Sequence, residues 1–440
     1  MVRIDVNFNK SAGAVRPLHG INNAPILGAD DRLFHYLGEA GIPYSRLHDT
    51  GGAFGGHVFV DIENIFRDFE ADANDPASYD FAFTDWLLNS LHKQGAEPFY
   101  RLGCTIENYH FIKPQHILPP KDVHKWAEIC AHIVAHYNQG WADGYKLGIR
   151  YWEIWNEPDN TPDIADNPMW KGTPEQYFEL YDAASKLLKE RFPEIKVGGY
   201  ASCGFYAILN SEADKNANVS PRTEYFLDFA NDFFKYIRKS GAPLDFFSWH
   251  SYGTAKQNIE FAKYARELLN SYGYIECESI LNEWNPGIAN RGKLKDAALI
   301  AAMFCTMHTK TDLDMMNYYD GQVHGSYQGM FDPVKLIPFK AYYAFTAFNA
   351  LYKLGNAVNT EYSCEAVPAM AAIGENGIAV LISNTRSKAE ECCITGLPDG
   401  KVTLKLIDLK HDLEICNEYT VVNGELKLKI GAHNVALIEG

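Results

Sequence analysis

The chain of 440 residues lacks several features that would place it in a class at once. It has no run of about 18 consecutive apolar residues, so no membrane-spanning helix is predicted. Its nine cysteines are an odd number without a CxxC pair, and Cys392 and Cys393 are adjacent. These features argue against a zinc ribbon and against a disulfide framework. The first residues alternate between apolar and polar, unlike a signal peptide, so we expect reduced thiols and a cytoplasmic protein.

Positive charge is also scarce. The chain has 40 lysines and arginines against 56 aspartates and glutamates, which gives a formal net charge of −16. We therefore expect neither nucleic acid nor a membrane as a partner, and a neutral substrate fits better than a polyanion. No glycine-rich phosphate loop follows the first predicted strand, which argues against a dinucleotide fold, and we expect no cofactor. A homo-oligomer is compatible with the sequence.

Short apolar runs alternate with helical patterns between residues 18 and 352. This alternation predicts parallel strands covered by helices. The predicted strands are 18–22, 44–47, 97–102, 151–155, 196–199, 245–248, 279–281 and 315–318. The predicted helices are 31–40, 83–93, 121–137, 174–192, 224–240, 257–271, 294–309 and 339–354. Eight strand–helix units favour an α/β fold, a (β/α)8 TIM barrel over residues 17–354, rather than an open doubly wound sheet.

The pattern changes after about residue 354. Short alternating runs appear at 370–373, 378–382, 402–406, 419–422, 426–430 and 435–438. Turn residues such as Asn423-Gly424 separate them, which is typical of antiparallel strands. The isolated strand pattern at residues 2–8 is expected to pair into the same sheet. We therefore predict a small accessory β-sandwich built from residues 1–16 and 355–440.

Two predicted barrel strands run into a glutamate beside Trp, Asn and Pro. Residues 151–158 read YWEIWNEP and residues 280–286 read ILNEWNP, so Glu157 and Glu283 follow the fourth and seventh strands. A TIM barrel has its active site at the carboxyl ends of its strands, which would bring both glutamates to one mouth. Such a pair of carboxylates is typical of glycoside hydrolysis. We expect Asn156 to hydrogen-bond a sugar hydroxyl and Trp155 to form an apolar wall that raises the pKa of the acid.

Polar residues on neighbouring strands are candidates for supporting roles. Arg46 on the second strand is expected either to bond the carboxylate of Glu283 or to pair with Glu153 inside the barrel. His250 and Tyr252 end the sixth strand. We expect His250 to bond a sugar hydroxyl and Tyr252 to donate to Glu283.

Other candidates for contact with a sugar lie at the remaining strand ends. A packed aromatic residue or a satisfied core histidine is the commoner role for residues of these types. The candidates are His19 with Asn22, His48 with Asp49, Trp284 beside the second glutamate, and Tyr318, Tyr319 and Asp320 at the floor of the pocket.

The sequence Trp155-Asn-Glu-Pro158, with a second glutamate after the seventh strand, resembles clan A glycoside hydrolases and, within the clan, family 39. Supporting segments are SRLHD at 45–49, YDFAFTD at 79–85, EPFYRLG at 97–103 and DFFSWHSY at 245–252. The resemblance covers most of the chain and implies retention through a covalent glycosyl-enzyme. It implies that Glu157 is the acid/base and Glu283 the nucleophile. The implied substrates are β-xylosides, with α-L-arabinopyranosides or β-galactosides as stereochemical neighbours.

The chain departs from the family pattern at two places. Asn282 precedes the second glutamate, where the family usually has Thr or Ser. After Leu102-Gly103 the chain reads CTIENYH, where the family commonly continues with bulky apolar residues and proline. We therefore expect Glu107 and His110 to face the sugar, and we expect both departures to affect the choice of substrate more than the chemistry.

Three alternatives stand beside an exo-acting glycosidase. A metal-dependent hydrolase would use His19, His48 and His250, but the first strand lacks a His-x-His pair and the motif at 155–158 would be unexplained, so we expect no metal. A non-catalytic carbohydrate-binding protein is disfavoured because both glutamates are intact. An endo-acting glycanase needs an open cleft, whereas the long segments 51–82 and 159–172 are expected to wall off the pocket and favour exo action.

Overall fold

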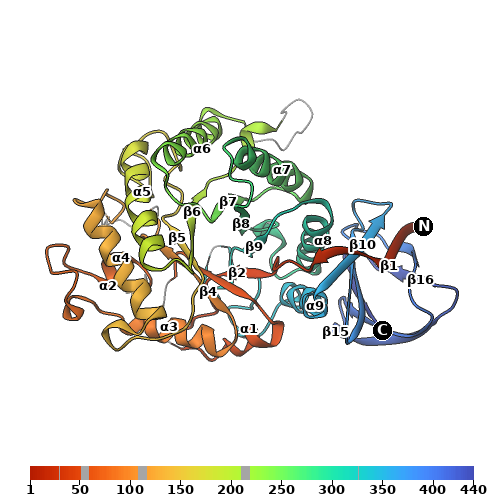
Figure 1. Ribbon diagram of the computed structural model, residues 1–440. Coiled ribbons are helices and arrows are strands. Elements are labelled where there is room, and N and C mark those ends of the chain that lie inside the picture. The colour runs from red at the N-terminus through yellow and green to blue at the C-terminus, as the bar shows by residue number, and fades with distance from the viewer. Residues whose placement is uncertain (29, 51–58, 108–115, 210–218, 326) are drawn as a thin grey trace.

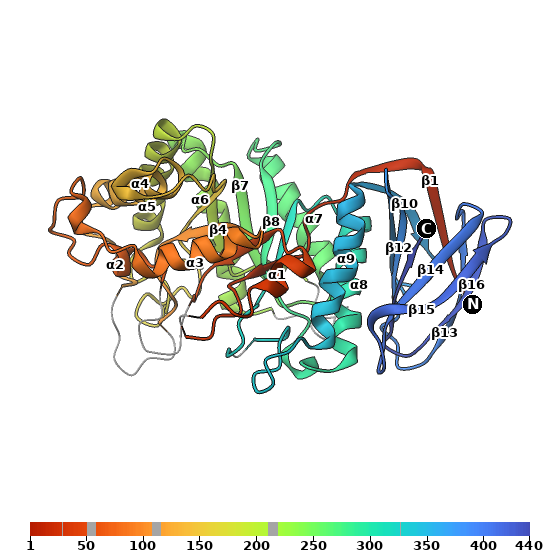
Figure 2. The ribbon, with the colours of Figure 1, turned by 90° about the horizontal axis from the view of Figure 1, so that it is seen from below.

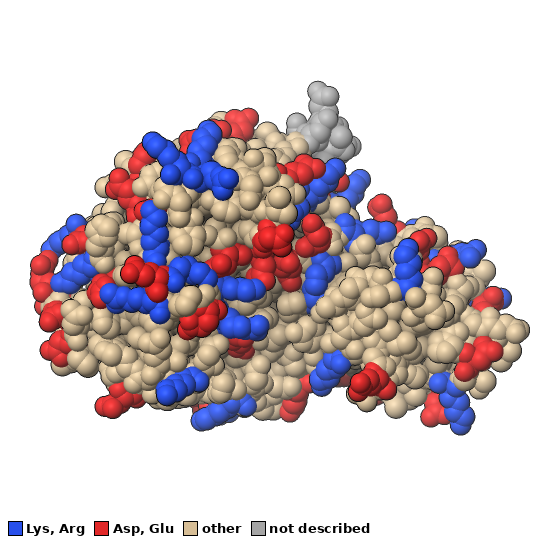
Figure 3. Space-filling view, viewed as in Figure 1, with Lys and Arg blue, Asp and Glu red and all other residues tan. Residues whose placement is uncertain are grey.

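The computed structural model describes residues 1–440 except residues 29, 51–58, 108–115, 210–218 and 326. The described chain forms a closed barrel with a separate sheet against one side of it (Figure 1 and Figure 2). No helix among the described residues is both long and apolar enough to cross a membrane. Acidic and basic side chains are interspersed on the face shown in Figure 3, so the net charge is not gathered into one patch there.

Eight parallel strands close the barrel in sequence order. They are β2 (Gly20–Asn22), β3 (Tyr44–Leu47), β4 (Glu97–Leu102), β5 (Tyr151–Ile154), β6 (Lys196–Ser202), β7 (Phe246–Ser251), β8 (Glu278–Trp284) and β9 (Met315–Tyr318). Strand β2 pairs with both β3 and β9, which closes the ring. Because helices cover the outside, the strands are buried on both faces, which explains their nearly continuous apolar runs. The TIM barrel predicted from the sequence is confirmed.

Helices form the outer layer of the barrel (Figure 1). They are α1 (His35–Ala40), α2 (Ile62–Ile65), α3 (Ala82–Lys93), α4 (Val123–Asn138), α5 (Pro174–Arg191), α6 (Pro221–Ser240), α7 (Ala255–Ser271), α8 (Leu294–Lys310) and α9 (Lys340–Leu354). Short 3-10 helices lie at Pro76–Ser78, Trp141–Asp143, Tyr206–Ile208 and Ile288–Asn290. Helices α5, α6 and α7 begin with capping boxes at Thr173, Ser220 and Thr254, which satisfy amides of the first turn.

Both ends of the chain form the second sheet. Its nine strands are β1 (Val2–Ala14), β10 (Asn356–Tyr362), β11 (Ala369–Gly374), β12 (Gly377–Ser383), β13 (Glu390–Thr395), β14 (Gly400–Ile407), β15 (Asp412–Val421), β16 (Glu425–Ile430) and β17 (Val435–Glu439). Strand β1 lies between β10, to which it is antiparallel, and β13, to which it is parallel. Side chains from all nine strands meet in one core, so the sheet bends around it. The predicted accessory β unit that includes the N-terminal strand is confirmed.

The accessory sheet packs against the barrel through β11 and β12. Met370 and Leu381 belong to the same apolar core as helices α8 and α9, whereas Ala371 and Val380 face the core of the sheet. This alternation follows from the two-residue period of a strand. The hydroxyl of Ser383 also donates to the carbonyl of Ala298 on α8 at 2.6 Å.

The sequence pattern misses β10 and β13 and ends β1 at residue 8 instead of Ala14. Strand β10 reads NAVNTEY and β13 reads EECCIT, so neither shows a run of typical apolar strand residues. Their burial depends on neighbouring strands, and cysteine acts as a small apolar residue in β13. All nine cysteines are free thiols, as expected.

Candidate active site

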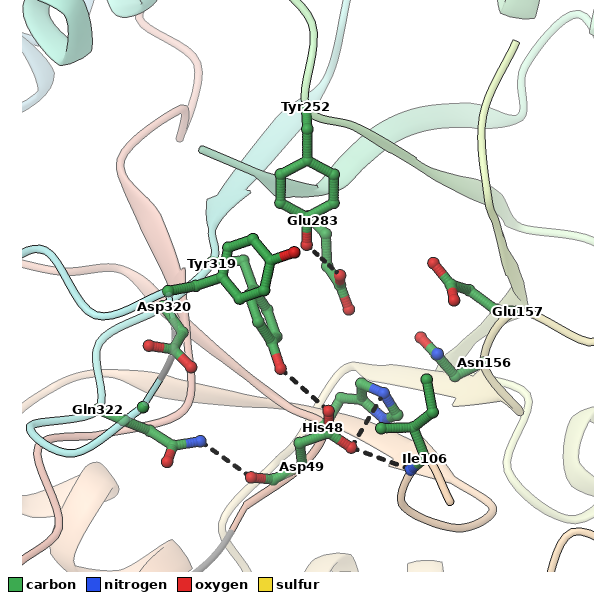
Figure 4. Close-up of a pocket in the computed structure, with 12 residues that line it drawn as sticks. His48, Asp49, Ile106, Asn156, Glu157, Tyr252, Glu283, Tyr319, Asp320 and Gln322 are labelled. Atoms are coloured by element: carbon green, nitrogen blue, oxygen red, sulfur yellow. Dashed lines mark hydrogen bonds and ion pairs between the residues drawn. The ribbon is translucent and has the colours of Figure 1, made fainter. Parts of the chain in front are cut away.

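A cavity of about 300 Å³ opens where the barrel strands end (Figure 4). This volume is at the low end for small-molecule sites. Most of the residues that line it end barrel strands or follow them directly. They are His48, Asp49, Ile106, Asn156, Glu157, Tyr252, Glu283, Tyr319, Asp320, Gln322, Gly325 and Tyr327.

Glu157 lies in a sharp turn just after β5. Trp155 and Glu157 have φ angles of 72° and 43°, a left-handed conformation that is uncommon outside glycine. The amide of Trp155 donates to the carbonyl of Leu102 at 2.7 Å, and the amide of Glu157 donates to the carbonyl of Ala201 at 3.1 Å. Bonds to both neighbouring strands therefore hold the turn, and the carboxyl group of Glu157 faces the cavity (Figure 4).

Both carboxylate oxygens of Glu157 have hydrogen-bond partners. Nδ1 of His250 lies 2.7 Å from Oε1, and Nδ2 of Asn160 donates to Oε2 at 2.8 Å. Cys203, which follows β6, also helps to lower the pKa of this carboxyl group. His250 therefore binds the predicted acid/base directly through Nδ1, and a bond from its imidazole to a sugar hydroxyl stays a prediction.

Glu283 is the penultimate residue of β8, so the strand continues past the position where the sequence pattern ends it. Arg46 donates to Oε1 at 2.8 Å, and the hydroxyl of Tyr252 donates to Oε2 at 2.8 Å. One carboxylate oxygen of Glu283, one of Glu157 and a ring nitrogen of His250 all lie within 4.8 Å of one another. The structure thus brings the two glutamates together, as the sequence predicts.

The guanidinium of Arg46 is fully buried. It pairs with both Glu283 and Glu153, the two alternatives predicted from the sequence. Nε donates to Glu153 at 2.8 Å, Nη1 donates to Glu283 and Nη2 donates to Asn156 at 2.6 Å. Asn282, one of the departures from the family pattern, donates to the other oxygen of Glu153 at 2.5 Å. Asn282 therefore supports the barrel interior beneath Glu283.

The charge of His250 determines the protonation of Glu157. Burial raises the pKa of Glu157, but the hydrogen bond and positive charge of His250, together with Asn160, hold it below its ordinary value. Burial lowers the pKa of His250, but Glu283 and Glu157 outweigh burial and raise it. In the free site the proton therefore resides mainly on His250, and its titration belongs to the pair.

Trp155 does not form the apolar wall predicted for the acid. Its side chain is buried, its Nε1 donates to the carbonyl of Met169, and its ring packs against Trp126 and Trp170. Burial by other groups raises the pKa of Glu157 instead, and the hydrogen bond and charge of His250 lower it again, so that the net shift is downward.

Asp49 follows β3 and lies on the side of the cavity away from Glu157 (Figure 4). The hydroxyl of Tyr319 donates to Oδ2 at 3.0 Å, and Nε2 of His48 lies 3.2 Å from Oδ1. Burial raises the pKa of Asp49 to about 7, and burial lowers the pKa of His48 well below its ordinary value. His48 is therefore neutral and Asp49 is only partly ionised at neutral pH.

Asp320 adds a second weakly acidic carboxyl group at the same end. It is buried, and its Oδ1 has no hydrogen-bond partner among the described residues. Burial, together with the charges of Asp49 and Glu283, raises the pKa of Asp320 to about 8. A protonated carboxyl group both donates and accepts hydrogen bonds, which matches the hydroxyl groups of a sugar.

Several predicted sugar contacts lie outside the cavity. Trp284 is fully buried and packs against Phe304 and Tyr318, because successive side chains of a strand face opposite sides and Glu283 faces inward. Glu107 is buried and accepts from the amide of His116 at 2.8 Å, and its neighbour Ile106 lines the cavity instead. Neither Trp284 nor Glu107 is among the described residues that line the cavity, and His110 lies outside the described residues.

The three histidines of the metal-dependent alternative do not converge. His19 lies against Phe348, and its Nε2 is 3.1 Å from the carbonyl oxygen of Gly41. His48 is next to Asp49, and His250 is next to Glu157. Asn22, predicted with His19, points into the barrel and donates to the carbonyl of Asn282.

Four residues at the site were not predicted: Asn160, Cys203, Gln322 and Tyr327. Asn160 follows Glu157 by three residues in the same turn, and side chains at this spacing can meet. The spacing alone could therefore have indicated Asn160 as a partner of Glu157. Gln322 donates to the carbonyl of Asp49, and Tyr327 packs near Tyr319. Both lie in the loop after β9, where the sequence has no helical or strand period that would predict the direction of a side chain.

The segments expected to wall off the pocket contribute no described lining residue. Residues 51–58 lie outside the described chain, and no residue of 59–82 or 159–172 lines the cavity. Exo action therefore stays a prediction that depends on the size of the cavity.

Comparison with known proteins places this geometry in a family. The sequence pattern described as "Glycosyl hydrolases family 39" matches residues 53–320, more than half of the chain. A protein named "Beta-xylosidase" from Geobacillus stearothermophilus is 23% identical over 342 residues, which cover 67% of this chain and 61% of that protein. A second "Beta-xylosidase", from Caldicellulosiruptor saccharolyticus, is 26% identical over 277 residues, which cover 58% of this chain and 47% of that protein. The match thus spans about half to three-fifths of these relatives.

Solved structures share the fold over the whole chain. A glucosidase from Croceicoccus marinus has a TM-score of 0.78 at 22% identity and covers 100% of this chain and 98% of its own. A monomeric beta-xylosidase from Caulobacter crescentus CB15 has a TM-score of 0.69 at 18% identity, with 99% of each chain covered.

Proposed function

The chain belongs to glycosyl hydrolases family 39, and on this premise we propose that it is a retaining exo-glycosidase that releases one β-xylose-like sugar from the end of a glycoside. The observation that carries this proposal is that one carboxylate oxygen of Glu157 lies within 4.8 Å of one carboxylate oxygen of Glu283. Retaining enzymes place these groups ~5–5.5 Å apart, whereas inverting enzymes leave ~6.5–9.5 Å for a water molecule. The short separation favours direct attack by a carboxylate.

Glu283 is the nucleophile in this proposal. Arg46 and Tyr252 donate to separate oxygens of its carboxylate, which fixes its direction towards the cavity. An oxygen of Glu283 forms a bond to the anomeric carbon while the bond to the leaving oxygen breaks. The leaving oxygen takes its proton from Glu157, and the sugar is held as an ester of Glu283.

Glu157 acts first as an acid and then as a base. The proton it donates is the one that it shares with Nδ1 of His250 across 2.7 Å. Formation of the ester removes the negative charge of Glu283, and loss of a neighbouring negative charge lowers the pKa of Glu157. Glu157 then accepts a proton from water, whose oxygen bonds to the anomeric carbon and releases Glu283.

The cavity favours a single neutral sugar. A volume of about 300 Å³ suits a small ligand better than a chain of sugars. Asp49 and Asp320 would face the part of the ring farthest from the bond that breaks (Figure 4). A uronic acid would bring its carboxylate towards Asp49, which is partly ionised at neutral pH, and this disfavours it. The names of both curated relatives point to β-xylosides, and that of one structural relative to a glucoside.

The test of the proposed function is a panel of nitrophenyl glycosides. We expect wild-type protein to cleave the β-D-xyloside or β-D-glucoside and to leave the β-D-glucuronide intact, because of the acidic end of the cavity. Proton NMR of the first product should show the β anomer, as double displacement requires. A first product of α configuration would contradict retention, and failure to cleave any glycoside or oligosaccharide would contradict the enzyme assignment.

Replacement of Asp320 by asparagine tests the assignment of the sugar-binding end. The amide keeps the shape but cannot ionise, and its donating and accepting ends are fixed, whereas a carboxyl group can carry its proton on either oxygen, so we expect kcat/KM to fall by about 10- to 100-fold. Asp312→Asn, in an exposed ion pair with Arg266, is the matched control and should retain activity. The loss should be much smaller for a substrate that lacks one ring hydroxyl. An equal loss for that substrate would show that Asp320 does not contact the missing hydroxyl.

A further inference from the structure

The surface residue Arg222 is linked to Glu157 through Asn160. Nε of Arg222 donates to the backbone carbonyl of Asn160 at 2.6 Å, and Nη2 donates to its side-chain Oδ1 at 3.1 Å. The other end of that amide, Nδ2, donates to Oε2 of Glu157 at 2.8 Å. Three hydrogen bonds thus connect an exposed guanidinium to a carboxylate that faces the cavity.

The structure holds Arg222 itself in place. It is the second residue of α6, which begins with the capping box of Ser220 and Thr223. Its guanidinium lies over the ring of Phe226, 5.0 Å from the centroid, and Phe226 is buried. A cation in the first turn of a helix opposes the helix dipole, so helix stability does not explain an arginine at this position.

The two ends of an asparagine amide have the same shape but opposite hydrogen-bonding character. If Oδ1 faced Glu157, it would repel an ionised carboxylate and accept a proton from a neutral one. Since Oδ1 is bound by Arg222, Nδ2 is the end that faces Glu157. The direction of the amide therefore decides whether Asn160 favours the ionised or the protonated form of Glu157.

We propose that Arg222 is a positioning residue for the acid/base: its guanidinium fixes the amide of Asn160 so that Nδ2 donates to Glu157. This proposal rests on the proposed function. Arg222 does not line the cavity, so it acts through Asn160 and not on the sugar. The arrangement favours the ionised form of Glu157, which is the form that acts as the base when the glycosyl-enzyme is hydrolysed.

Other groups also determine the ionisation of Glu157, and they are unchanged when Arg222 is replaced. They come from β7, β8, the turn of Glu157 itself and the segment after β6. They are His250, Tyr252, Glu283, Asp159, Cys203 and Tyr206. The hydrogen bond from Asn160 lowers the pKa of Glu157, so its loss should raise that pKa.

The experiment compares Arg222→Met, Arg222→Lys and wild type on a phenyl glycoside of the sugar that wild-type enzyme cleaves. Phenolate is a poor leaving group, so the alkaline limb of kcat/KM reports the acid form of Glu157. In Arg222→Met we expect the apparent pKa of this limb to rise by roughly half a pH unit to one pH unit. Arg222→Lys keeps the charge but loses the planar pair of donors, and we expect it to show most of the same shift.

A second variant separates positioning from folding. Asn160→Leu removes the donor itself, so adding Arg222→Met to it should cause no further shift of the alkaline limb. A profile of Arg222→Met that matches wild type, even with a lower Tm, would overturn the proposal and leave a structural role. Wild-type behaviour of Arg222→Lys would also overturn it, because charge alone would then explain the effect. Failure of wild type to cleave any glycoside would instead refute the proposed function.

Discussion

Glu283→Ala is expected to lower kcat by about 10⁴-fold or more, because no other carboxylate among the described residues lies opposite Glu157 to form the covalent bond to the sugar. The carboxylate of Glu283 lies between Arg46 and Tyr252 and within 4.8 Å of Glu157. Its removal leaves Arg46 bound to Glu153, Asn156 and Asn22, so the buried guanidinium keeps three partners and the barrel should still fold. The measurement is hydrolysis of the best nitrophenyl glycoside, with circular dichroism and Tm to verify folding.

The same strand offers a control for this variant. Glu278 begins β8, at the opposite end of the strand from the cavity, and pairs with Lys196. Glu278→Ala should retain kcat within a few-fold, because a partly exposed ion pair contributes little to stability. Residual activity of Glu283→Ala close to that of Glu278→Ala would refute the role of Glu283 as nucleophile.

Glu157→Ala should slow the enzyme by about 10²- to 10⁴-fold on substrates with poor leaving groups, which need a proton. A dinitrophenyl glycoside needs no proton on its leaving oxygen, so its bond to the sugar should still break and the glycosyl-enzyme should accumulate. Added azide, a small anion that needs no general base, should enter the space left by the side chain and restore turnover. The product should be a glycosyl azide of retained configuration, which NMR identifies.

The azide experiment also has a control in the same segment. Asp163 follows Glu157 in the loop after β5, does not line the cavity and is exposed. Asp163→Ala should retain activity and should not respond to azide. A glycosyl azide of inverted configuration would mean that azide attacks the face opposite the departing group, so no covalent intermediate would have formed. In that case Glu157 would not be the acid/base of a double displacement.

The barrel was predictable because its physical requirements are local. Each strand is buried on both faces and therefore appears as a short apolar run such as YWEI or FFSWHS, followed by an amphipathic helix. Strands β10 and β13 were not predictable in this way, since they are polar or cysteine-rich and are buried only because β1 lies between them. Their partner is at the other end of the chain, and no local window contains it.

The two glutamates were predictable from their motifs, but their surroundings were only partly so. Strand geometry puts Glu283 and Trp284 on opposite faces, which the sequence pattern did not reveal because it ended the strand too early. The contact between His250 and Glu157 joins two strands that are not neighbours in the sequence, and its 2.7 Å distance reverses the direction of the acid's pKa. Such a reversal depends on the distance between charges, which a sequence does not contain.

The position of β1 inside the accessory sheet affects how the chain is made. Ile4 pairs with Tyr362 and Val2 pairs with Cys392, so β1 waits for partners that are translated several hundred residues later. At synthesis rates of 5–20 residues per second, that wait is about 20–70 s. Throughout it the nascent chain carries an apolar strand without hydrogen-bond partners, the kind of segment that chaperones bind and that aggregates when they are scarce. The accessory sheet therefore cannot assemble until ribosomes have translated the whole barrel between β1 and β10, so its core forms after the barrel sequence is already available to fold.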